Sequence, residues 1–461
     1  MPWFTFNRTT VTRTGAAIIE RALLGAATFL VTIMLGRWGG PQELGLFIIF
    51  FPLLFIAIAL QESMITAPYT VYLANHEHAD ERRRYLGSVF SHTAILSAIV
   101  SALFAAGAIG MWLLGFSSFA IVAAVLAPVA PCVLLREFAR RVVYADLKPE
   151  IAIAISGSVS ALQLAMMAAL HVSGRLDAAS AFAAMGLSSL VVATAWLYLN
   201  RGSIQFRGTP TAADFRQNWT LGRWSVATQV GEIVRTQMFP WLLALAADKT
   251  TVGIFAACAV IAALPTPLHV ALSNILLPQF VQLQKQGGVA AANRLVWQAT
   301  GWLTAVMLLF FVVVSATSAW IVPWVYGPLY VGTQQAVIVM ALAQVVAGAS
   351  LPAARALFVM QRPDQVFTSH LVGIIANIAL GLPMVYFWGF TGAAYATLIG
   401  AVLKAVLGNW WYYVEVRQQL DGQRAGASPP PVRDGLRARG RAGSLGGGVL
   451  PVGVGVTEDA P

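Results

Sequence analysis

Charged side chains are rare inside the long apolar stretches of this sequence, and the few that occur there are the first candidates for chemistry. An ionisable group deep in a bilayer is costly, so it is normally found facing a polar cavity or an oppositely charged partner. Arg235 and Lys404 fall near the middle of their stretches, and we expect both to line a polar cavity. The full set of candidate substrate-binding residues is Arg235, Lys404, Glu232, Glu62, Arg21 and Glu20.

The remaining candidates leave alternatives open. Glu232 lies three residues before Arg235, on the same helical face, so it either neutralises the arginine or lines the cavity with it. Glu20 and Arg21 lie near the cytoplasmic end of the first stretch, where long side chains can also reach the membrane interface. Glu62 lies toward the cytoplasmic side of the second stretch.

These residues must be positioned by membrane-spanning helices. The chain is 58% hydrophobic and 10% charged, whereas soluble domains are about one quarter charged. A bilayer core about 30 Å thick needs about 20 apolar residues per helix. We therefore predict an all-α polytopic membrane protein with about twelve spans, at 15–36, 45–73, 87–113, 117–139, 150–172, 178–200, 222–246, 251–277, 295–322, 334–359, 366–388 and 390–414.

Basic residues alternate between abundant and scarce in successive gaps between the spans. The gaps predicted to be external hold only Arg37, Arg175 and Lys249. Lys and Arg are enriched on the cytoplasmic side of membrane proteins, so the pattern places both termini in the cytoplasm. The net charge of +10 is explained by this bias and does not indicate nucleic-acid binding. Cys132 and Cys258 fall inside predicted spans and are expected to be free.

The spans divide into two similar sets of six. Gly45-Leu46-Phe47 resembles Gly253-Ile254-Phe255, and the Arg141 to Glu150 segment resembles the Arg355 to Asp364 segment. An even number of helices per repeat gives both repeats one orientation, related by a pseudo-twofold axis along the membrane normal. We expect an N-terminal lobe at 1–200, a cytoplasmic linker at 201–221, a C-terminal lobe at 222–415 and a disordered basic Gly/Pro/Arg-rich cytoplasmic tail at 416–461.

This organisation indicates a transporter rather than an enzyme. Two similar lobes facing each other across a cavity suit alternating access. The sequence contains no Walker loop, no zinc-spaced His and Cys cluster and no Gly-x-Ser-x-Gly elbow. We predict no cofactor and no metal site, and consider H⁺ or Na⁺ as a coupling ion.

Four segments resemble the polysaccharide-flippase (Wzx-like) branch of the multidrug/oligosaccharidyl-lipid/polysaccharide (MOP) exporter superfamily. They are similar to the turn after the first helix, the end of the eighth helix, the external turn before the tenth and the Gly-x-x-Gly-Ala-Ala segment before the twelfth. In this chain they are Arg37–Phe47, Leu276–Phe280, Tyr326–Tyr330 and Gly389–Ala396.

The resemblance implies a flippase for undecaprenyl-pyrophosphate-linked oligosaccharides in the bacterial inner membrane, serving exopolysaccharide or O-antigen (lipopolysaccharide) synthesis. A cavity carrying Arg235 and Lys404 would lower the cost of desolvating an anionic pyrophosphate. The expected partners are the lipid-linked substrate, membrane lipids and a polysaccharide polymerase or assembly complex, with no nucleic acid. The protein is expected to be a monomer, because one chain contains both lobes.

Two other functions are considered. A cation-coupled multidrug or metabolite antiporter of the same superfamily would need a carboxylate site inside one lobe, for which Glu20 or Glu62 could serve. A membrane polysaccharide polymerase or ligase would need a sizeable external loop with catalytic Arg or His, and the predicted external gaps are short.

Overall fold

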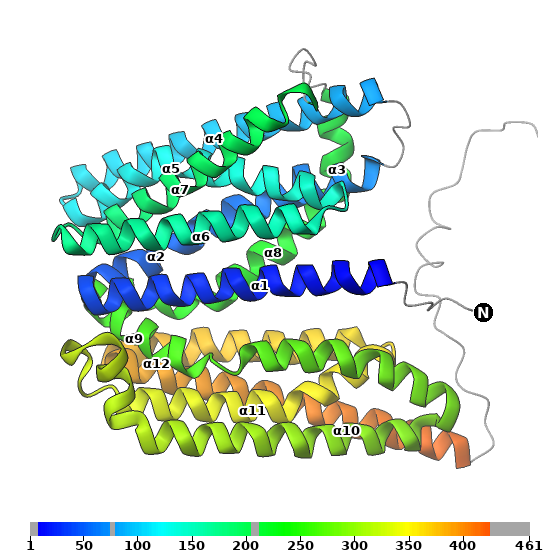
Figure 1. The fold of residues 1–461 in the computed structure, drawn as a ribbon. Helices are drawn as coiled ribbons and strands as arrows, with labels where there is room; N and C mark the ends of the chain where they lie inside the picture. The colour runs from blue at the N-terminus through cyan, green and yellow to red at the C-terminus, as the bar shows by residue number, and fades with distance from the viewer. Residues whose placement is uncertain (1–7, 74–78, 204–211, 425–461) are drawn as a thin grey trace, which may run out of the picture. The chain divides into compact units, whose positions relative to one another are not determined.

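The computed structural model describes residues 8–73, 79–203 and 212–424, and within these ranges every regular element is a helix. The first half of the chain forms seven α-helices, two of which are extended by π-helical turns (Figure 1). These elements are α1 (Arg8–Met34), η1 (Leu35–Gly39), α2 (Pro41–Gln61), η2 (Glu62–Thr66), α3 (Ala67–Tyr72), α4 (Ala79–Leu113), α5 (Ser117–Ala145), α6 (Pro149–Val172) and α7 (Ala178–Leu199).

The second half forms five α-helices, and two of them are long enough to contain two crossings each. Gly288 and Gly389 have positive φ angles, 67° and 54°, which mark a change of direction inside α10 and α12. A left-handed backbone at these two positions suits glycine, which lacks a Cβ. The helices are α8 (Ala212–Ala246), α9 (Lys249–Ala262), α10 (Thr266–Tyr326), α11 (Gln334–Val359) and α12 (Pro363–Arg424), with a short 3₁₀ turn, η5 (Pro328–Tyr330), after α10.

The helices are long and apolar enough to make this a multi-pass membrane protein. Within the described ranges, nine segments have the length and composition of a membrane span. Residues of the long α12 form one of these nine, although it turns at Gly389. The prediction of an all-helical membrane protein is confirmed, while the number of twelve crossings and the sides of the termini stay predictions.

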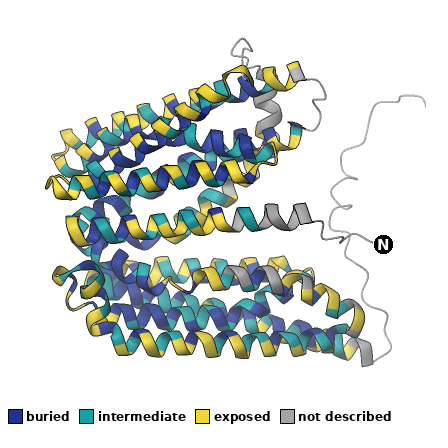
Figure 2. Cartoon of the chain, in the orientation of Figure 1, coloured by how far each residue is buried: buried dark blue, intermediate teal, exposed yellow. Residues whose placement is uncertain are grey.

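Buried apolar side chains gather into separate cores in the two halves. One core is formed by α1, α2 and α4–α7 around Phe47, Leu126 and Phe182. Another lies in the second half around Leu243 and Val337. Figure 2 shows buried residues on the inward faces of the helices and exposed residues on the outward faces, as expected for helices whose outer surface meets lipid.

The internal repeat predicted from the sequence is visible in two turns with the same geometry. Leu147 and Gln361 are the two described non-glycine residues with positive φ, at 58° and 59°. Each precedes a basic residue and a proline, and in each turn the basic residue's N–H donates to a carbonyl five residues earlier, Lys148 to Val143 and Arg362 to Leu357. This is the Schellman pattern of hydrogen bonds that ends a helix. The turns before α6 and α12 are therefore structural counterparts.

A second sign of the repeat is the reciprocal crossing of α2 and α9. A Cβ added at Gly45 would lie 1.7 Å from the Lys249 carbonyl oxygen, and one added at Gly253 would lie 1.8 Å from the Pro41 carbonyl oxygen. Both pairs of equivalent residues are 208 positions apart (253 minus 45, and 249 minus 41). Reciprocal contacts of this kind are what a twofold relation produces.

The structure departs from the sequence-based expectation at the span expected at 251–277 and at the end of the last helix. The span expected at 251–277 is interrupted, because α9 ends at Ala262 and α10 begins at Thr266, beside Pro265 and Pro267. Proline removes a backbone donor and starts helices more readily than it continues them. The last helix continues to Arg424, beyond its expected end at 414. Most of the expected tail, and residues 204–211 of the expected linker, lie outside the described residues.

Candidate functional site

Helix α8 carries two of the candidate residues and is held against α2 and against the π-helical turn η2. The Gln229 side-chain amide donates to Ser63 Oγ at 2.7 Å, and Trp241 Nε1 donates to the Ile49 carbonyl at 3.1 Å. Glu232 and Arg235 lie between these two contacts along α8. The helix therefore places this charged pair where the two halves of the chain meet.

Glu232 and Arg235 form an ion pair. Arg235 Nε donates to Glu232 Oε2 at 2.8 Å, and a second hydrogen bond joins a terminal guanidinium nitrogen to Glu232 Oε1. The arginine side chain is 36% exposed and the glutamate side chain 60% exposed. The local pairing considered from the sequence is present, and it leaves both groups accessible from outside the protein core.

Lys404 joins this pair from α12. The two parts of α12 pack closely where a Cβ at Gly373 would lie 3.1 Å from the Gly400 carbonyl and 3.4 Å from Lys404 Cβ. Lys404 lies close enough to Arg235 and Glu232 to interact electrostatically with both, by repulsion with Arg235 and by attraction with Glu232. Three candidates from distant parts of the sequence are thus brought together.

His370 adds a group that sequence reasoning missed. It lies three residues before Gly373 on α12, and it interacts electrostatically with Lys404, Arg235 and Glu232, as well as with Arg355 on α11. We call Glu232, Arg235, His370 and Lys404 the second-half polar cluster. It contains one carboxylate, one guanidinium, one lysine amine and one histidine.

Glu20 lies in a different place, inside the first half. Its carboxylate is 2% exposed and accepts hydrogen bonds from Ser156 Oγ at 2.6 Å, from Arg140 at 3.3 Å and from the Tyr144 hydroxyl. These partners belong to α5 and α6, so Glu20 ties α1 to both helices. The interfacial position considered from the sequence does not describe this buried side chain.

The network around Glu20 extends to a second buried carboxylate. Glu137 accepts from Arg140 at 2.5 and 3.0 Å and from Arg136 at 2.6 Å. We call Glu20, Arg136, Glu137 and Arg140 the first-half ion network. It holds two carboxylates and two guanidinium groups, so its charges balance, and ion pairs of this kind are the form in which charge is tolerated within a membrane protein.

The last two candidates are separate from both clusters. Glu62 lies at the start of the π-helical turn η2 and pairs with Arg141 of α5 at 2.5 Å, and both side chains are 29% exposed. Arg21 follows Glu20 on α1 but is exposed. The structure therefore brings together Glu232, Arg235 and Lys404, and it does not bring Glu20, Arg21 or Glu62 to them.

Sequence reasoning also missed Arg136 and Glu137, although both fall inside the span expected at 117–139. The available signal was their spacing with Arg140, since Glu and Arg three residues apart share a helical face. The expected span ended at residue 139, so Arg136 and Glu137 were placed inside it and Arg140 in the cytoplasmic gap that follows. No such spacing marks His370, because its partners lie far from it in the sequence, on α8, on α11 and in the second part of α12.

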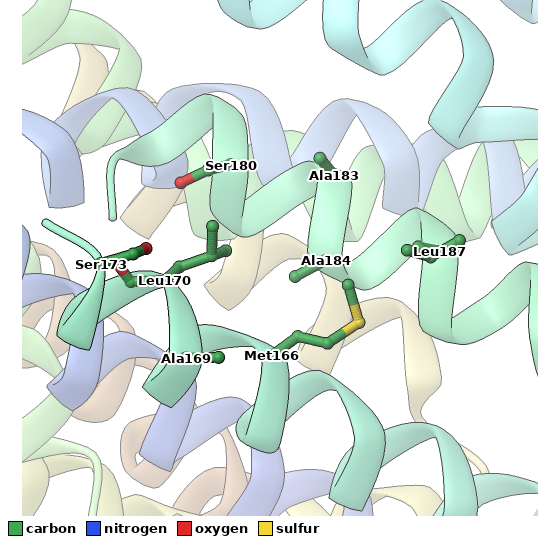
Figure 3. Close-up of a pocket in the computed structure, with 8 residues that line it drawn as sticks. All are labelled: Met166, Ala169, Leu170, Ser173, Ser180, Ala183, Ala184 and Leu187. Carbon is green, nitrogen blue, oxygen red and sulfur yellow. The ribbon is translucent and has the colours of Figure 1, made fainter. Parts of the chain in front are cut away.

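A groove between α6 and α7 is apolar and contains none of the candidate residues (Figure 3). It has a volume of about 340 Å³ and is lined by methionine, leucine and alanine side chains, with Ser173 and Ser180 at one end. In the described ranges no three His, Cys, Asp or Glu side chains are close enough to share a metal ion.

The fold is that of transporters of the MOP superfamily. No family model and no curated protein sequence matches the chain. Among solved structures, the chain resembles the inward-facing conformation of a multidrug resistance MATE family transporter of the MOP superfamily, with 13% identity and a TM-score of 0.71 over 88% of this chain and 99% of the other.

Two other solved structures share the same architecture. The lipid II flippase MurJ in an inward closed conformation matches with 14% identity and a TM-score of 0.67, over 89% of this chain and 91% of the other. A MOP superfamily transporter from Pyrococcus furiosus matches with 13% identity and a TM-score of 0.57, over 88% of this chain and 96% of the other. At these identities the likeness concerns the fold.

Proposed function

We propose that this chain is a transporter of the MOP superfamily that flips undecaprenyl-pyrophosphate-linked oligosaccharides across the bacterial inner membrane by alternating access. The second-half polar cluster is the proposed site for the anionic pyrophosphate. The fold shared with a lipid II flippase and with MATE transporters supports the transporter class. The choice of cargo rests on the charges of the cluster.

The observation that carries the proposal is the excess of basic side chains in this cluster. Glu232 is already engaged by Arg235 through two hydrogen bonds. Among the residues described, no carboxylate forms an ion pair with Lys404 or Arg355. A cationic group buried near the middle of a membrane is costly without a counter-ion. A pyrophosphate bound beside Lys404 and Arg235 would supply that counter-ion.

The exposure of the pair supports a water-filled space beside α8. Charged side chains inside transmembrane segments almost always face the protein interior or an aqueous cavity. Arg235 and Glu232 lie on the helix that contacts both halves, and their side chains are accessible. Water between the two halves would solvate them and would admit a polar headgroup.

The same contacts do not favour the antiporter alternative. Its candidate carboxylates were Glu20 and Glu62. Glu20 is occupied by three donors and Glu62 by Arg141, so neither is an open cation site. A positively charged drug would also meet repulsion from Lys404 and Arg235.

The test is glycolipid accumulation in a strain that lacks this protein. Undecaprenyl-linked oligosaccharides would be extracted and assigned to each leaflet by their accessibility to an impermeant reagent. We expect finished units to accumulate on the cytoplasmic face. The wild-type chain and Lys404→Arg should restore export, whereas Lys404→Ala and Arg235→Ala should not. Arg201→Gln removes a basic side chain that stacks on Tyr198 away from the cluster, and it serves as the matched control.

Three other outcomes would contradict the proposed site or indicate a different function. Normal transport by both alanine variants would refute the role of the cluster. Finished units outside the membrane with only the polymer missing would indicate a polymerase or ligase. Normal glycolipids with altered drug sensitivity would indicate an antiporter.

A further inference from the structure

Arg37 crosses from the first half of the chain to the end of a helix in the second half. It lies in η1, the π-helical turn that follows α1, and its guanidinium donates to the carbonyl oxygens of Trp324 and of Val325, the latter at 3.1 Å. Both carbonyls belong to the last turn of α10, which ends at Tyr326. The last carbonyls of a helix lack partners within the helix and carry its partial negative charge, so a cation stabilises them.

A second contact lies beside the first. The Tyr330 hydroxyl of η5 donates to the Gly36 carbonyl at 3.1 Å, and Tyr330 is fully buried. Gly36 also receives the ring of Tyr326, because a Cβ at Gly36 would lie 2.5 Å from Tyr326 Cδ1. Two consecutive residues of η1 therefore contact the segment 324–330. Arg37 binds its carbonyl oxygens, and Gly36 packs against Tyr326 and accepts a hydrogen bond from Tyr330.

The crossing of α2 and α9 lies beside these contacts, because a Cβ added at Gly36 would also lie 3.1 Å from Leu44 Cδ2. Gly45 and Gly253 allow the two backbones to touch, as described above. Leu44, next to Gly45, is 0% exposed and belongs to the hydrophobic core of the second half. Because Leu44 comes from the first half, its burial reports directly on whether the two halves are joined here.

We propose that Arg37 and Tyr330 form a latch that holds the two halves together at this end, which the charge pattern predicts to be the external end. The inference rests on the proposed function only in assuming that the halves separate here during transport. The bonds are made to carbonyl oxygens rather than to carboxylates. The latch is therefore insensitive to protonation of an acidic partner, and it can open without leaving a buried carboxylate unpaired.

The physical consequence is a change in the population of the opened state. A hydrogen bond to a charged group shifts an equilibrium by about 10- to 100-fold. Removing the guanidinium should raise the opened fraction by that order. Removing only the Tyr330 hydroxyl should raise it less, by about 2- to 10-fold, because that bond is between neutral groups.

The experiment measures the reactivity of a cysteine at position 44 in the purified full-length protein in nanodiscs. Cys132 and Cys258 are first replaced by alanine, and Leu44→Cys is then added. A polar maleimide reaches both faces of a nanodisc, so the result does not depend on the orientation of the chain. We expect slow labelling in this background, labelling at least about 10-fold faster with Arg37→Gln, and a smaller increase with Tyr330→Phe.

Two matched controls separate the latch from general loosening. Arg175→Gln removes another basic side chain from a predicted external gap, at a turn where the Arg175 carbonyl accepts a hydrogen bond from Ser180, and it should leave the rate unchanged. Gly253→Ala should accelerate labelling, because its Cβ would collide with the Pro41 carbonyl, whereas Gly107→Ala should not, since nothing lies within 4 Å of its added Cβ.

Unchanged labelling in Arg37→Gln and Tyr330→Phe would overturn the latch. If Arg37→Gln does not fold, Tyr330→Phe tests the same inference. The readout needs no substrate, so a failed glycolipid assay with accelerated labelling would reject the proposed cargo and retain the latch. Normal flipping by the wild-type protein with unchanged labelling in the variants would retain the proposed cargo and reject the latch.

Discussion

The first-half ion network predicts that the carboxylate of Glu20 stabilises the fold, while its neighbour Arg21 does not. Glu20→Gln keeps the size and one acceptor oxygen of the side chain but removes its charge. Three donors then lose their anionic partner, namely Arg140, Ser156 and Tyr144. Arg140 keeps Glu137 as a partner through two hydrogen bonds, so it is not left unpaired.

The magnitude follows from these contacts. Complete loss of a partner for a buried charge costs about 3–5 kcal/mol. The retained Glu137 bonds reduce the loss to that of hydrogen bonds to a charged group, about 1.5–3 kcal/mol. For a folded part of roughly 200 residues, the size of the first half of the chain, each kcal/mol shifts the melting temperature by about 2–4 °C. We therefore expect Glu20→Gln to melt about 3–12 °C below wild type.

The assay is thermal unfolding of the purified protein in one detergent at one scan rate, which keeps the kinetic contribution constant. Arg21→Gln is the matched control, because Arg21 is exposed on the same helix and exposed substitutions usually change stability by less than about 0.5 kcal/mol. A double-mutant cycle with Arg140→Gln then isolates the pairwise term. Equal melting temperatures for Glu20→Gln and Arg21→Gln, or a coupling within the error of the cycle, would refute the reasoning.

Three further predictions concern stability and use the same assay. Glu62→Gln should lower the melting temperature little, because its pair with Arg141 is partly exposed and such pairs contribute about 0–1 kcal/mol. Asp177→Ala should cost about 1 kcal/mol, since it removes the capping box that starts α7, and an unchanged melting temperature would contradict that assignment. Gly400→Ala should destabilise, because its Cβ would lie 2.0 Å from Asn377 Oδ1, whereas Gly301→Ala should be neutral or stabilising.

The helices were largely predictable, because in lipid the backbone N–H and C=O groups of an apolar stretch of this length must be hydrogen-bonded within the protein, and a helix does this within one segment. The expected span 334–359 coincides with α11, and 178–200 lies within one residue of α7. The interruption at Ala263–Pro265 was not predicted, because apolar residues continue through it and hydropathy does not detect a turn. The prolines there were the available signal.

The candidate site was predictable only in part. Mid-stretch charge singled out Glu232, Arg235 and Lys404, and the local pair of Glu232 with Arg235 was one of the two arrangements expected from their spacing. The position of Lys404 beside that pair was not predicted. The partners of Glu20 were not predicted, because the depth of a residue in a span does not reveal its partners. Arg140 was assigned to a loop, so its position inside α5 beside Glu20 could not be anticipated.

The two halves share turns and a twofold crossing, yet they use charge differently. In the first half, Glu20 and Glu137 are matched by Arg136 and Arg140, and every one of these groups has a protein partner. In the second half, Glu232 is matched by Arg235, while Lys404 adds a further cation beside them. A balanced buried network resists change, because any rearrangement would unpair a charge.

An unbalanced cluster, by contrast, gains stability from an anion that arrives from outside. Binding that occurs only in one arrangement of the halves shifts the equilibrium toward that arrangement by the difference in affinity. The first half would then act as the rigid body against which α8 is held by Ser63 and Ile49, and the second half would sense the cargo. We therefore propose that the charge difference between the repeats, and not their shared fold, selects an anionic substrate.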